Sequence, residues 1–199
     1  MCQLLETIKL ENGIFHNLRY HKLRFNRARY ELFGISQEVS LENVIPVPEE
    51  YKKGVYRCRV VYSKEIEKVE FIAHQPRVIK SLKIVVDNNI EYGYKYLNRE
   101  KLNHLYAMRG DCDEIVIIKN GLVTDCSIGN LVFYDGQKWW TPSTPLLNGT
   151  RRMQLIDDGL IFEKRITTDD ISSFQKAGII NVFYGTENLP EIPVTSIYF

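Results

Sequence analysis

The fold is decided by Tyr94-Lys95-Tyr96-Leu97-Asn98-Arg99, followed about thirty residues later by Gly121-Leu122-Val123-Thr124-Asp125-Cys126-Ser127-Ile128-Gly129-Asn130. A lysine amine can form a Schiff base with an aldehyde cofactor, and an acid beside a ring nitrogen lets that ring accept electrons from the substrate carbon. Lys95 and Asp125 supply these two groups. Each also has a structural interpretation, because a lone lysine is ordinarily solvated and an aspartate before Cys126-Ser127 can cap a turn. Other segments must therefore decide between the two interpretations.

Composition excludes several function classes. The 199 residues include 26 basic and 25 acidic side chains, for a net charge of +1, so no general attraction to nucleic acid or an anionic membrane is expected. The four cysteines lack C-x-x-C spacing and the four histidines lack a zinc pattern, which predicts a reduced, metal-free, cytoplasmic protein. No apolar run approaches the roughly 20 residues that span a bilayer, and the start has no signal-peptide pattern.

Local patterns predict two α+β units in one chain. The proline in His74-Gln75-Pro76-Arg77 suggests a boundary, giving a small N-terminal domain over residues 1–77 and a larger C-terminal domain over residues 78–199. In the first domain we expect a hairpin over 4–15, a helix over 17–33 and a hairpin over 55–73. In the second we expect strands at 82–86, 114–119, 131–134 and 179–184, and helices over 98–109 and from 149 onward.

Several segments have the groups that a phosphate requires, namely backbone N–H donors, a hydroxyl and a cation. Gly149-Thr150-Arg151 opens a predicted helix, Gly185-Thr186 lies in a predicted turn, and the first helix carries several arginines. Taken singly, each has an ordinary structural role: a helix entry, a turn hydroxyl and a solvated helix face. The order of these segments along the chain favours a shared role in binding a phosphate.

That order resembles the class IV aminotransferases, the fold-type IV pyridoxal-phosphate enzymes. Leu5-Glu6-Thr7-Ile8 with Asn12-Gly13 is similar to the family's early strand and turn, and His21-Lys22-Leu23-Arg24-Phe25 resembles its H-x-x-R motif. Leu146-Leu147-Asn148-Gly149-Thr150-Arg151-Arg152 resembles its phosphate-cup motif. The resemblance covers nearly the whole chain. It implies an α+β, two-domain fold like that of D-amino acid aminotransferase, with the cofactor in the interdomain cleft, and a homodimer.

The resemblance also assigns site residues. Lys95 falls on the catalytic Schiff-base lysine, Asp125 on the usual glutamate beside the pyridine nitrogen, and Arg152 on a family arginine. The residues implied to bind pyridoxal 5'-phosphate are Arg24, Lys95, Asp125, Ser127, Gly149, Thr150, Arg151 and Thr186. For the carboxylate of a small amino substrate, three cations remain alternatives: Lys64, Arg57 and Arg59. No metal ligand is expected.

Within the family, Lys95-Tyr96-Leu97-Asn98-Arg99 and Asp125-Cys126 look more like aminodeoxychorismate lyase than branched-chain aminotransferase. The lyase resemblance implies loss of pyruvate from 4-amino-4-deoxychorismate to give 4-aminobenzoate, a reaction of folate biosynthesis. A class IV aminotransferase acting on D- or branched-chain amino acids and a catalytically weak cofactor-binding relative remain alternatives. Asp125 is one methylene shorter than the usual glutamate, which predicts a weaker electron sink. The family hairpin that precedes the early strand has no counterpart here, and a neighbouring subunit is expected to take its place.

Overall fold

The computed structural model describes residues 2–199, which form two compact units. The first unit extends to Pro76 and also includes Tyr94–Asn98, whereas the second comprises Arg77–Gly93 and Arg99–Phe199. The single boundary after residue 77 that the sequence suggests does not account for Tyr94–Asn98. This short segment carries Lys95, so the lysine belongs structurally to the first unit.

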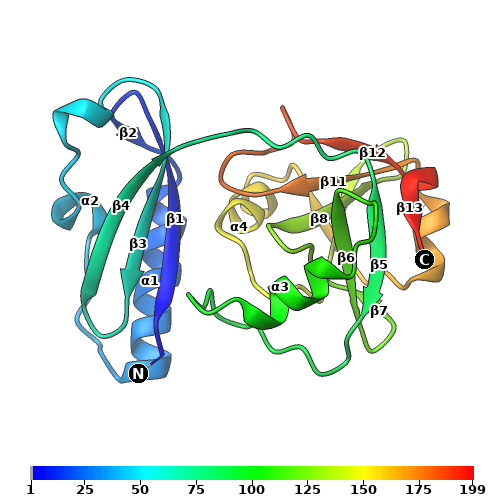
Figure 1. Ribbon diagram of the computed structural model, residues 1–199, viewed down its shortest axis with the longest axis horizontal. Helices are drawn as coiled ribbons and strands as arrows, with labels where there is room; N and C mark the ends of the chain where they lie inside the picture. Colours follow the sequence, from blue (N-terminus) through cyan, green and yellow to red (C-terminus); the bar gives the residue numbers. More distant parts are fainter. Residues whose placement is uncertain (1) are drawn as a thin grey trace. The chain divides into compact units, whose positions relative to one another are not determined.

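The first unit is a four-stranded antiparallel sheet in the order β2-β1-β3-β4, with helix α1 along one face (Figure 1). Asn12 and Gly13 have φ angles of 50° and 81°, as expected for the two-residue turn that joins β1 to β2. Gly34, with φ 71°, ends α1. Both expected hairpins and the expected helix are confirmed. The bounds are β1 (Leu4–Glu11), β2 (Ile14–Phe15), α1 (Leu18–Phe33), α2 (Leu41–Val44), η1 (Glu49–Tyr51), β3 (Val55–Tyr62) and β4 (Ile66–Ala73).

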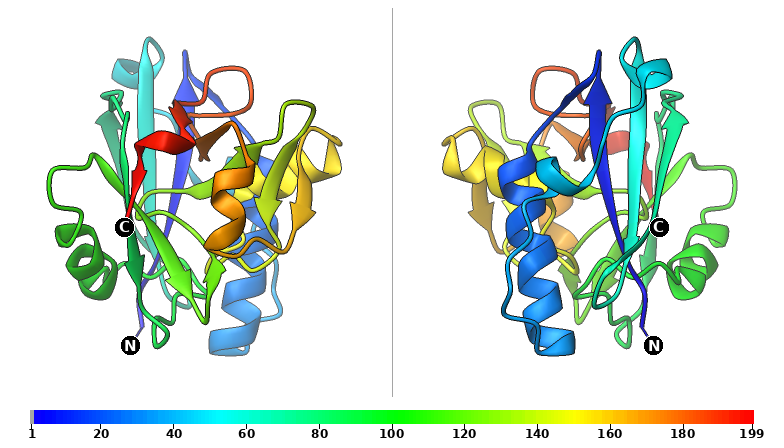
Figure 2. Two further views of the ribbon diagram at one scale, coloured as in Figure 1. Left: turned by 90° about the vertical axis from the view of Figure 1, so that its right-hand side faces the viewer. Right: turned by 90° about the vertical axis from the view of Figure 1, so that its left-hand side faces the viewer.

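The core of the first unit lies between α1 and the sheet, and Figure 2 shows the helix beside these strands in two further views. Along β1, buried positions alternate with half-buried ones from Glu6 onward, as in a strand with one covered face. Ile8 and Leu10 occupy this face and are fully buried together with Phe25 of α1. Glu6 takes a position of the same face, which places a carboxylate in an otherwise apolar layer.

The segment that carries Lys95 pairs with the start of β1. Leu5 N donates to the Lys95 carbonyl at 2.9 Å, and Leu97 N donates to the Gln3 carbonyl at 2.9 Å. Leu4 forms an antiparallel bridge with Tyr96 while also pairing with β3, so the segment lies on the edge of β1 that β2 occupies further along. Backbone hydrogen bonds to β1 thus fix the position of Lys95.

The second unit has four layers. A sheet of order β13-β5-β6-β7 and a sheet of order β10-β9-β8-β11-β12 share one apolar core, to which Val116 and Phe133 contribute from the two sheets. Helix α3 packs through Leu102 and Leu105 against the other face of the first of these sheets, and α4 packs through Leu155 against the other face of the second. Among residues 2–199, no helix is both long enough and apolar enough to cross a membrane.

The expected elements of the second unit are present, with one correction. The predicted strand over 179–184 is instead β11 (Lys176–Ile180), because Asn181 and Tyr184 bond each other's backbone and Asn181 Oδ1 accepts from Phe183 N in a tight turn. The other bounds are β5 (Leu82–Val86), α3 (Glu100–Ala107), β6 (Glu114–Lys119), β7 (Leu122–Val123), β8 (Asn130–Tyr134), β9 (Trp139–Pro142), α4 (Thr150–Asp157), β10 (Phe162–Lys164), η2 (Asp169–Ser173), β12 (Glu191–Pro193), η3 (Val194–Ser196) and β13 (Ile197–Tyr198).

Candidate active site

A buried polar network connects β1 with α1 in the first unit. His21 and Arg24 lie three residues apart, so both reach the same side of the helix. Glu6 accepts from His21 Nδ1 at 2.5 Å, from Arg24 Nε at 2.8 Å and from a terminal Arg24 nitrogen at 2.6 Å. Glu6 and His21 are fully buried, and 13% of the Arg24 side chain is exposed. The carboxylate therefore orients the arginine that the sequence implicates in phosphate binding.

The charges of this network are set by its neighbours. Burial raises the pKa of Glu6, but the Arg24 charge and the hydrogen bonds from His21 and Arg24 outweigh it and lower that pKa to about 2. Burial lowers the pKa of His21 more than its bond to Glu6 raises it, so the imidazole is neutral and donates from Nδ1. Lys95 is among the positive charges that lower the pKa of His21. Lys95 is therefore close enough to His21 to influence its titration.

Asp125 lies between β7 and β8 in the second unit and is 5% exposed. Its Oδ1 accepts from Asn130 Nδ2 at 2.7 Å, and its Oδ2 accepts from Leu147 N at 2.9 Å. Burial raises the pKa of Asp125 to about 7, although these hydrogen bonds and the Arg152 charge lower it. Among residues 2–199 no cation bonds this carboxyl, so the positively charged nitrogen of a protonated pyridine ring would suit it chemically.

The start of α4 has the features of an anion site. The first backbone N–H groups of a helix have no partner within the helix and carry a partial positive charge. Gly149 is the N-cap residue, and Thr150, the first helical residue, is 2% exposed. Gly185 precedes Thr186 in a turn whose residue Glu187 bonds Arg151 of the helix at 2.5 Å. The structure thus brings the Gly149–Arg151 and Gly185–Thr186 motifs together.

Arg151 and Arg152 have different roles. Arg151 bonds Gln154 and Glu187, which fastens α4 to the turn after Gly185. The Arg152 side chain is buried and donates to four different oxygens, those of Thr141 Oγ1, Pro142 O, Asn148 Oδ1 and Glu163 Oε1. Because these four acceptors use its nitrogens, Arg152 is a structural arginine, and the backbone N–H of Arg151 is the better group for a phosphate.

Ser127 is held from two sides. Its hydroxyl and its N–H donate to Glu114 at 2.8 Å and 3.2 Å, and its carbonyl accepts from Arg99 at 2.5 Å. Glu114 is 1% exposed, and burial raises its pKa. The Ser127 hydroxyl proton is therefore already engaged in a hydrogen bond to Glu114, and the contacts of this residue shape the loop after Asp125.

Four residues of these networks were not singled out from the sequence: Glu6, His21, Arg99 and Glu114. Three of them nevertheless stand within the motifs that were quoted for other reasons. Glu114 was indicated only by its place directly before the apolar run of the strand Glu114–Lys119. An acid at such a position usually bonds a nearby polar group, because an unpaired buried charge is costly.

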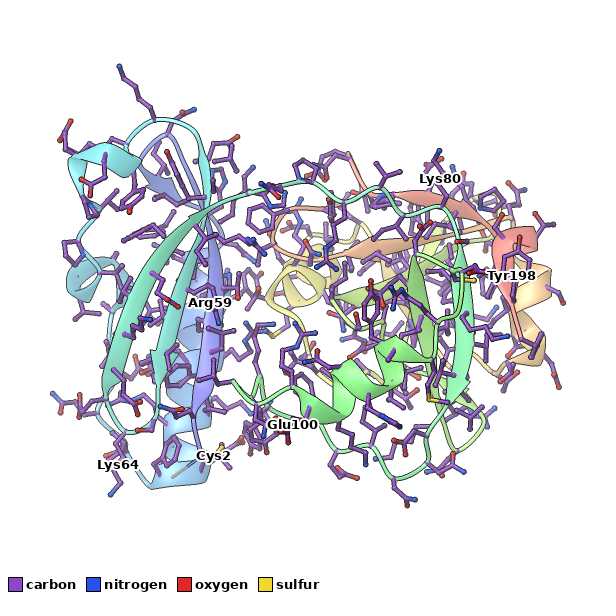
Figure 3. All side chains as sticks on the ribbon, viewed as in Figure 1. Cys2, Arg59, Lys64, Lys80, Glu100 and Tyr198 are labelled. Carbon is purple, nitrogen blue, oxygen red and sulfur yellow. The ribbon has the colours of Figure 1, made fainter. Side chains whose placement is uncertain are left out.

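The three candidate carboxylate ligands separate into two groups. Arg57 and Arg59 lie two residues apart on β3, on the face opposite to the buried Cys58 and Val60, whereas Lys64 is exposed at the β3–β4 turn (Figure 3). Arg59 bonds Glu70 at 3.2 Å. Among residues 2–199, the buried Arg57 Nε has no hydrogen-bond partner. Arg57 is therefore the better placed of the two to receive an added carboxylate.

Comparison with known proteins establishes the family. The family model described as "Amino-transferase class IV" matches residues 3–186, so the chain belongs to the class IV aminotransferases. It is an enzyme of this pyridoxal-phosphate-dependent family, and the expected α+β, fold-type IV architecture is confirmed. In the part of the chain that the structure describes, no cluster of three or more His, Cys, Asp or Glu side chains could hold a metal ion.

Three relatives illustrate the match. A Haemophilus influenzae protein of unassigned function is 42% identical over 187 residues, covering 93% of this chain and all of the relative. A crystal structure from Haemophilus somnus 129PT, named as a candidate 4-amino-4-deoxychorismate lyase, is 32% identical with a TM-score of 0.86, covering 93% of this chain and 98% of the other. The pyridoxal-phosphate-bound form of a hypothetical aminotransferase from Mycobacterium tuberculosis shares the fold, with 15% identity, a TM-score of 0.75, and coverage of 96% and 80%.

Proposed function

We propose that this chain is a pyridoxal-phosphate-dependent lyase that eliminates pyruvate from 4-amino-4-deoxychorismate and leaves 4-aminobenzoate, a step of folate biosynthesis. The observation that carries the reaction is the 32% identity, over 93% of the chain, to a structure named as a candidate lyase of this substrate. The sequence Lys95-Tyr96-Leu97-Asn98-Arg99 supports the same choice. We expect the protein to act as a cytoplasmic homodimer.

The residues present suit the cofactor at both of its ends. When bound, pyridoxal phosphate supplies an aldehyde that captures amines and a ring that accepts electrons from the substrate carbon. We assign Lys95 to the covalent link and Asp125 to the ring nitrogen, where a carboxyl with a pKa of about 7 can hold or accept a proton. We assign the phosphate to Arg24, Thr186 and the first turn of α4, which provides the N–H groups of Thr150 and Arg151. Gly149 and Ser127 shape this surface.

The side chains of this protein would have separate roles in the reaction. The Lys95 amine, which would hold the cofactor before the substrate binds, would move protons between substrate atoms as general base and acid. Asp125 would keep the ring nitrogen protonated. Arg57, with its unpartnered buried Nε, would bind a carboxylate of the dicarboxylate substrate, and Arg59 and Lys64 are the alternatives.

An aminotransferase is the second candidate, because the chain matches a family described by that activity. Lys95 would then serve a proton shift within an amino acid, and a second half-reaction with a 2-oxo acid would be required. D- or branched-chain amino acids are the substrates to test. The two candidates share every cofactor-binding residue, so only turnover distinguishes them.

The first test is the absorption spectrum of the purified protein with added pyridoxal phosphate, followed by borohydride reduction and peptide mapping. We expect a yellow complex and reduction onto Lys95. Pyruvate release from 4-amino-4-deoxychorismate would then support the lyase, whereas amino transfer to a 2-oxo acid without pyruvate release would support the aminotransferase. A Lys95 adduct without either turnover would indicate a catalytically weak relative, and no specific adduct would overturn the cofactor assignment.

A further inference from the structure

We propose that Asn130 is a positioning residue that fixes the distance between Asp125 and the first turn of α4. The proposal rests on the proposed function, because these are the two places at which the second unit would hold the ring nitrogen and the phosphate. The cofactor has a fixed length between these groups. A single side chain that sets the corresponding spacing in the protein would prepare the site before the cofactor binds.

A closed set of hydrogen bonds supports this role. Asn130 Nδ2 donates to Asp125 Oδ1 at 2.7 Å and to the Leu147 carbonyl at 2.8 Å. Leu147 N donates in turn to Asp125 Oδ2 at 2.9 Å, so the three residues form a ring in which each bonds the other two. Asp125 and Asn130 are both 5% exposed. A buried polar network with its groups satisfied is rigid, and each bond in it is costly to remove.

The other end of the Asn130 amide faces the helix. A Cβ added at Gly149, the N-cap of α4, would collide with Asn130 Oδ1. Gly149 has φ −68° and ψ 145°, which any residue adopts, so its backbone conformation does not require glycine. The requirement arises from the approach of Asn130. The amide therefore bonds the acid with its nitrogen and sets the position of the helix start with its oxygen.

A double-mutant cycle tests the contact itself. Gly149→Ala should lower the free energy of unfolding in urea when Asn130 is present. The loss should be much smaller in an Asn130→Ala background, where the side chain that blocks the new methyl is gone. If Gly149→Ala costs the same in both backgrounds, the contact does not exist and the proposal fails. This readout needs no cofactor.

A binding experiment tests positioning at the first turn of α4, where the phosphate would bind. The ratio of the dissociation constants of pyridoxal and pyridoxal phosphate measures what the phosphate contributes. We expect this ratio to fall about tenfold in Asn130→Ala, the equivalent of one hydrogen bond to a charged group. Asn26→Ala is the matched control, since that amide also bonds backbone groups, those of Val39, but contacts neither Asp125 nor Gly149.

The effect on Asp125 is measured in the cofactor-free protein by 13C NMR titration of labelled aspartate carboxyls. The Asn130 hydrogen bond lowers the pKa of Asp125, so the titration midpoint should rise in Asn130→Ala, while the Leu147 N–H and the Arg152 charge remain. If Asn130→Ala does not fold, Gly149→Ala should show the same two shifts, because its methyl displaces the amide. If only the binding ratio or only the Asp125 titration midpoint changes, or if neither changes, the proposal is overturned.

These outcomes are separable from those of the proposed function. If the wild type binds no pyridoxal phosphate, the proposed function fails, and the urea cycle and the Asp125 titration still decide whether Asn130 joins the two ends. If the wild type binds the cofactor while the binding ratio, the titration and the cycle are unaffected, only the role of Asn130 is refuted.

Discussion

Replacing Glu6 with glutamine should destabilise the first unit by about 3 kcal/mol at pH 7. Glu6 is fully buried and accepts three hydrogen bonds, two of them from Arg24. Its pKa falls from 4.5 to about 2, and at about 1.4 kcal/mol per pKa unit this shift corresponds to roughly 3 kcal/mol of stabilisation of the ionised form. Glutamine keeps the shape but loses the charge, and its amide protons would face the donors of Arg24.

The pH dependence of this effect has a definite sign. Because the native state lowers the pKa of Glu6, its contribution is fully present above the unfolded-state value of 4.5 and is lost as the pH falls toward 2. The difference in the free energy of unfolding between the wild type and Glu6→Gln should therefore be constant from pH 7 to about pH 6 and should narrow below pH 4.5.

Urea unfolding monitored by circular dichroism, at several pH values between 7 and 3, measures this difference. Glu70→Gln is the control, since Glu70 lies on β4 of the same sheet and pairs with Arg59 and Lys68 in contact with solvent. Its loss should cost less than about 1 kcal/mol. If Glu6→Gln loses as little unfolding free energy as the control, or loses the same amount at pH 7 and at pH 3, the assignment of Glu6 as the ionised partner of Arg24 is refuted.

Three further changes have expected outcomes. Lys95→Ala should give no borohydride-stable adduct by mass spectrometry while retaining weaker, reversible cofactor binding; a remaining adduct would place the covalent link elsewhere. Arg152→Met should lower the free energy of urea unfolding by about 3 kcal/mol, because it leaves buried acceptors unpaired, and Arg151→Met by about 1 kcal/mol or less; equal losses would contradict their different roles. Asp125→Glu should weaken pyridoxal-phosphate binding about tenfold, as expected when a methylene is forced into a filled space, and tighter binding would show that the shorter acid is a handicap.

Most of the fold was predictable from local signals. The alternation along β1, the Asn12-Gly13 turn and the glycine after α1 are properties of neighbouring residues, and the corresponding elements are present. The return of Tyr94–Asn98 to β1 was not predictable in this way, because the pairing joins Leu4 with Tyr96 across most of the first half of the chain. Only long-range contacts specify it.

Motif spacing identified groups in the site but not their partners. Arg151 and Arg152 are adjacent in sequence, yet successive residues of a helix point about 100° apart, so one side chain enters the core and the other reaches a neighbouring turn. The same limit applies to Ser127, whose bonds to Glu114 and Arg99 depend on how separate segments pack. The sequence-based assignments of Lys95, Arg24 and Thr186 to the cofactor stay predictions.

Glu6 and Asp125, two buried acids of these networks, show how environment separates the functions of carboxyl groups. Glu6 and Asp125 lose almost the same contact with water, and burial alone raises the pKa of each. Glu6 is bonded directly by the Arg24 guanidinium and stays ionised far below neutral pH, which suits a structural charge that holds an arginine in place. The Arg152 charge also lowers the pKa of Asp125, but its donors go to other oxygens, and burial raises that pKa to about 7. A carboxyl in that state gains most from a new positive partner, since a bonded cation would lower its pKa as Arg24 lowers that of Glu6. A protonated ring nitrogen would be such a partner, and the absence of a bonded cation is therefore the property that favours Asp125, rather than Glu6, as the acid proposed for the cofactor.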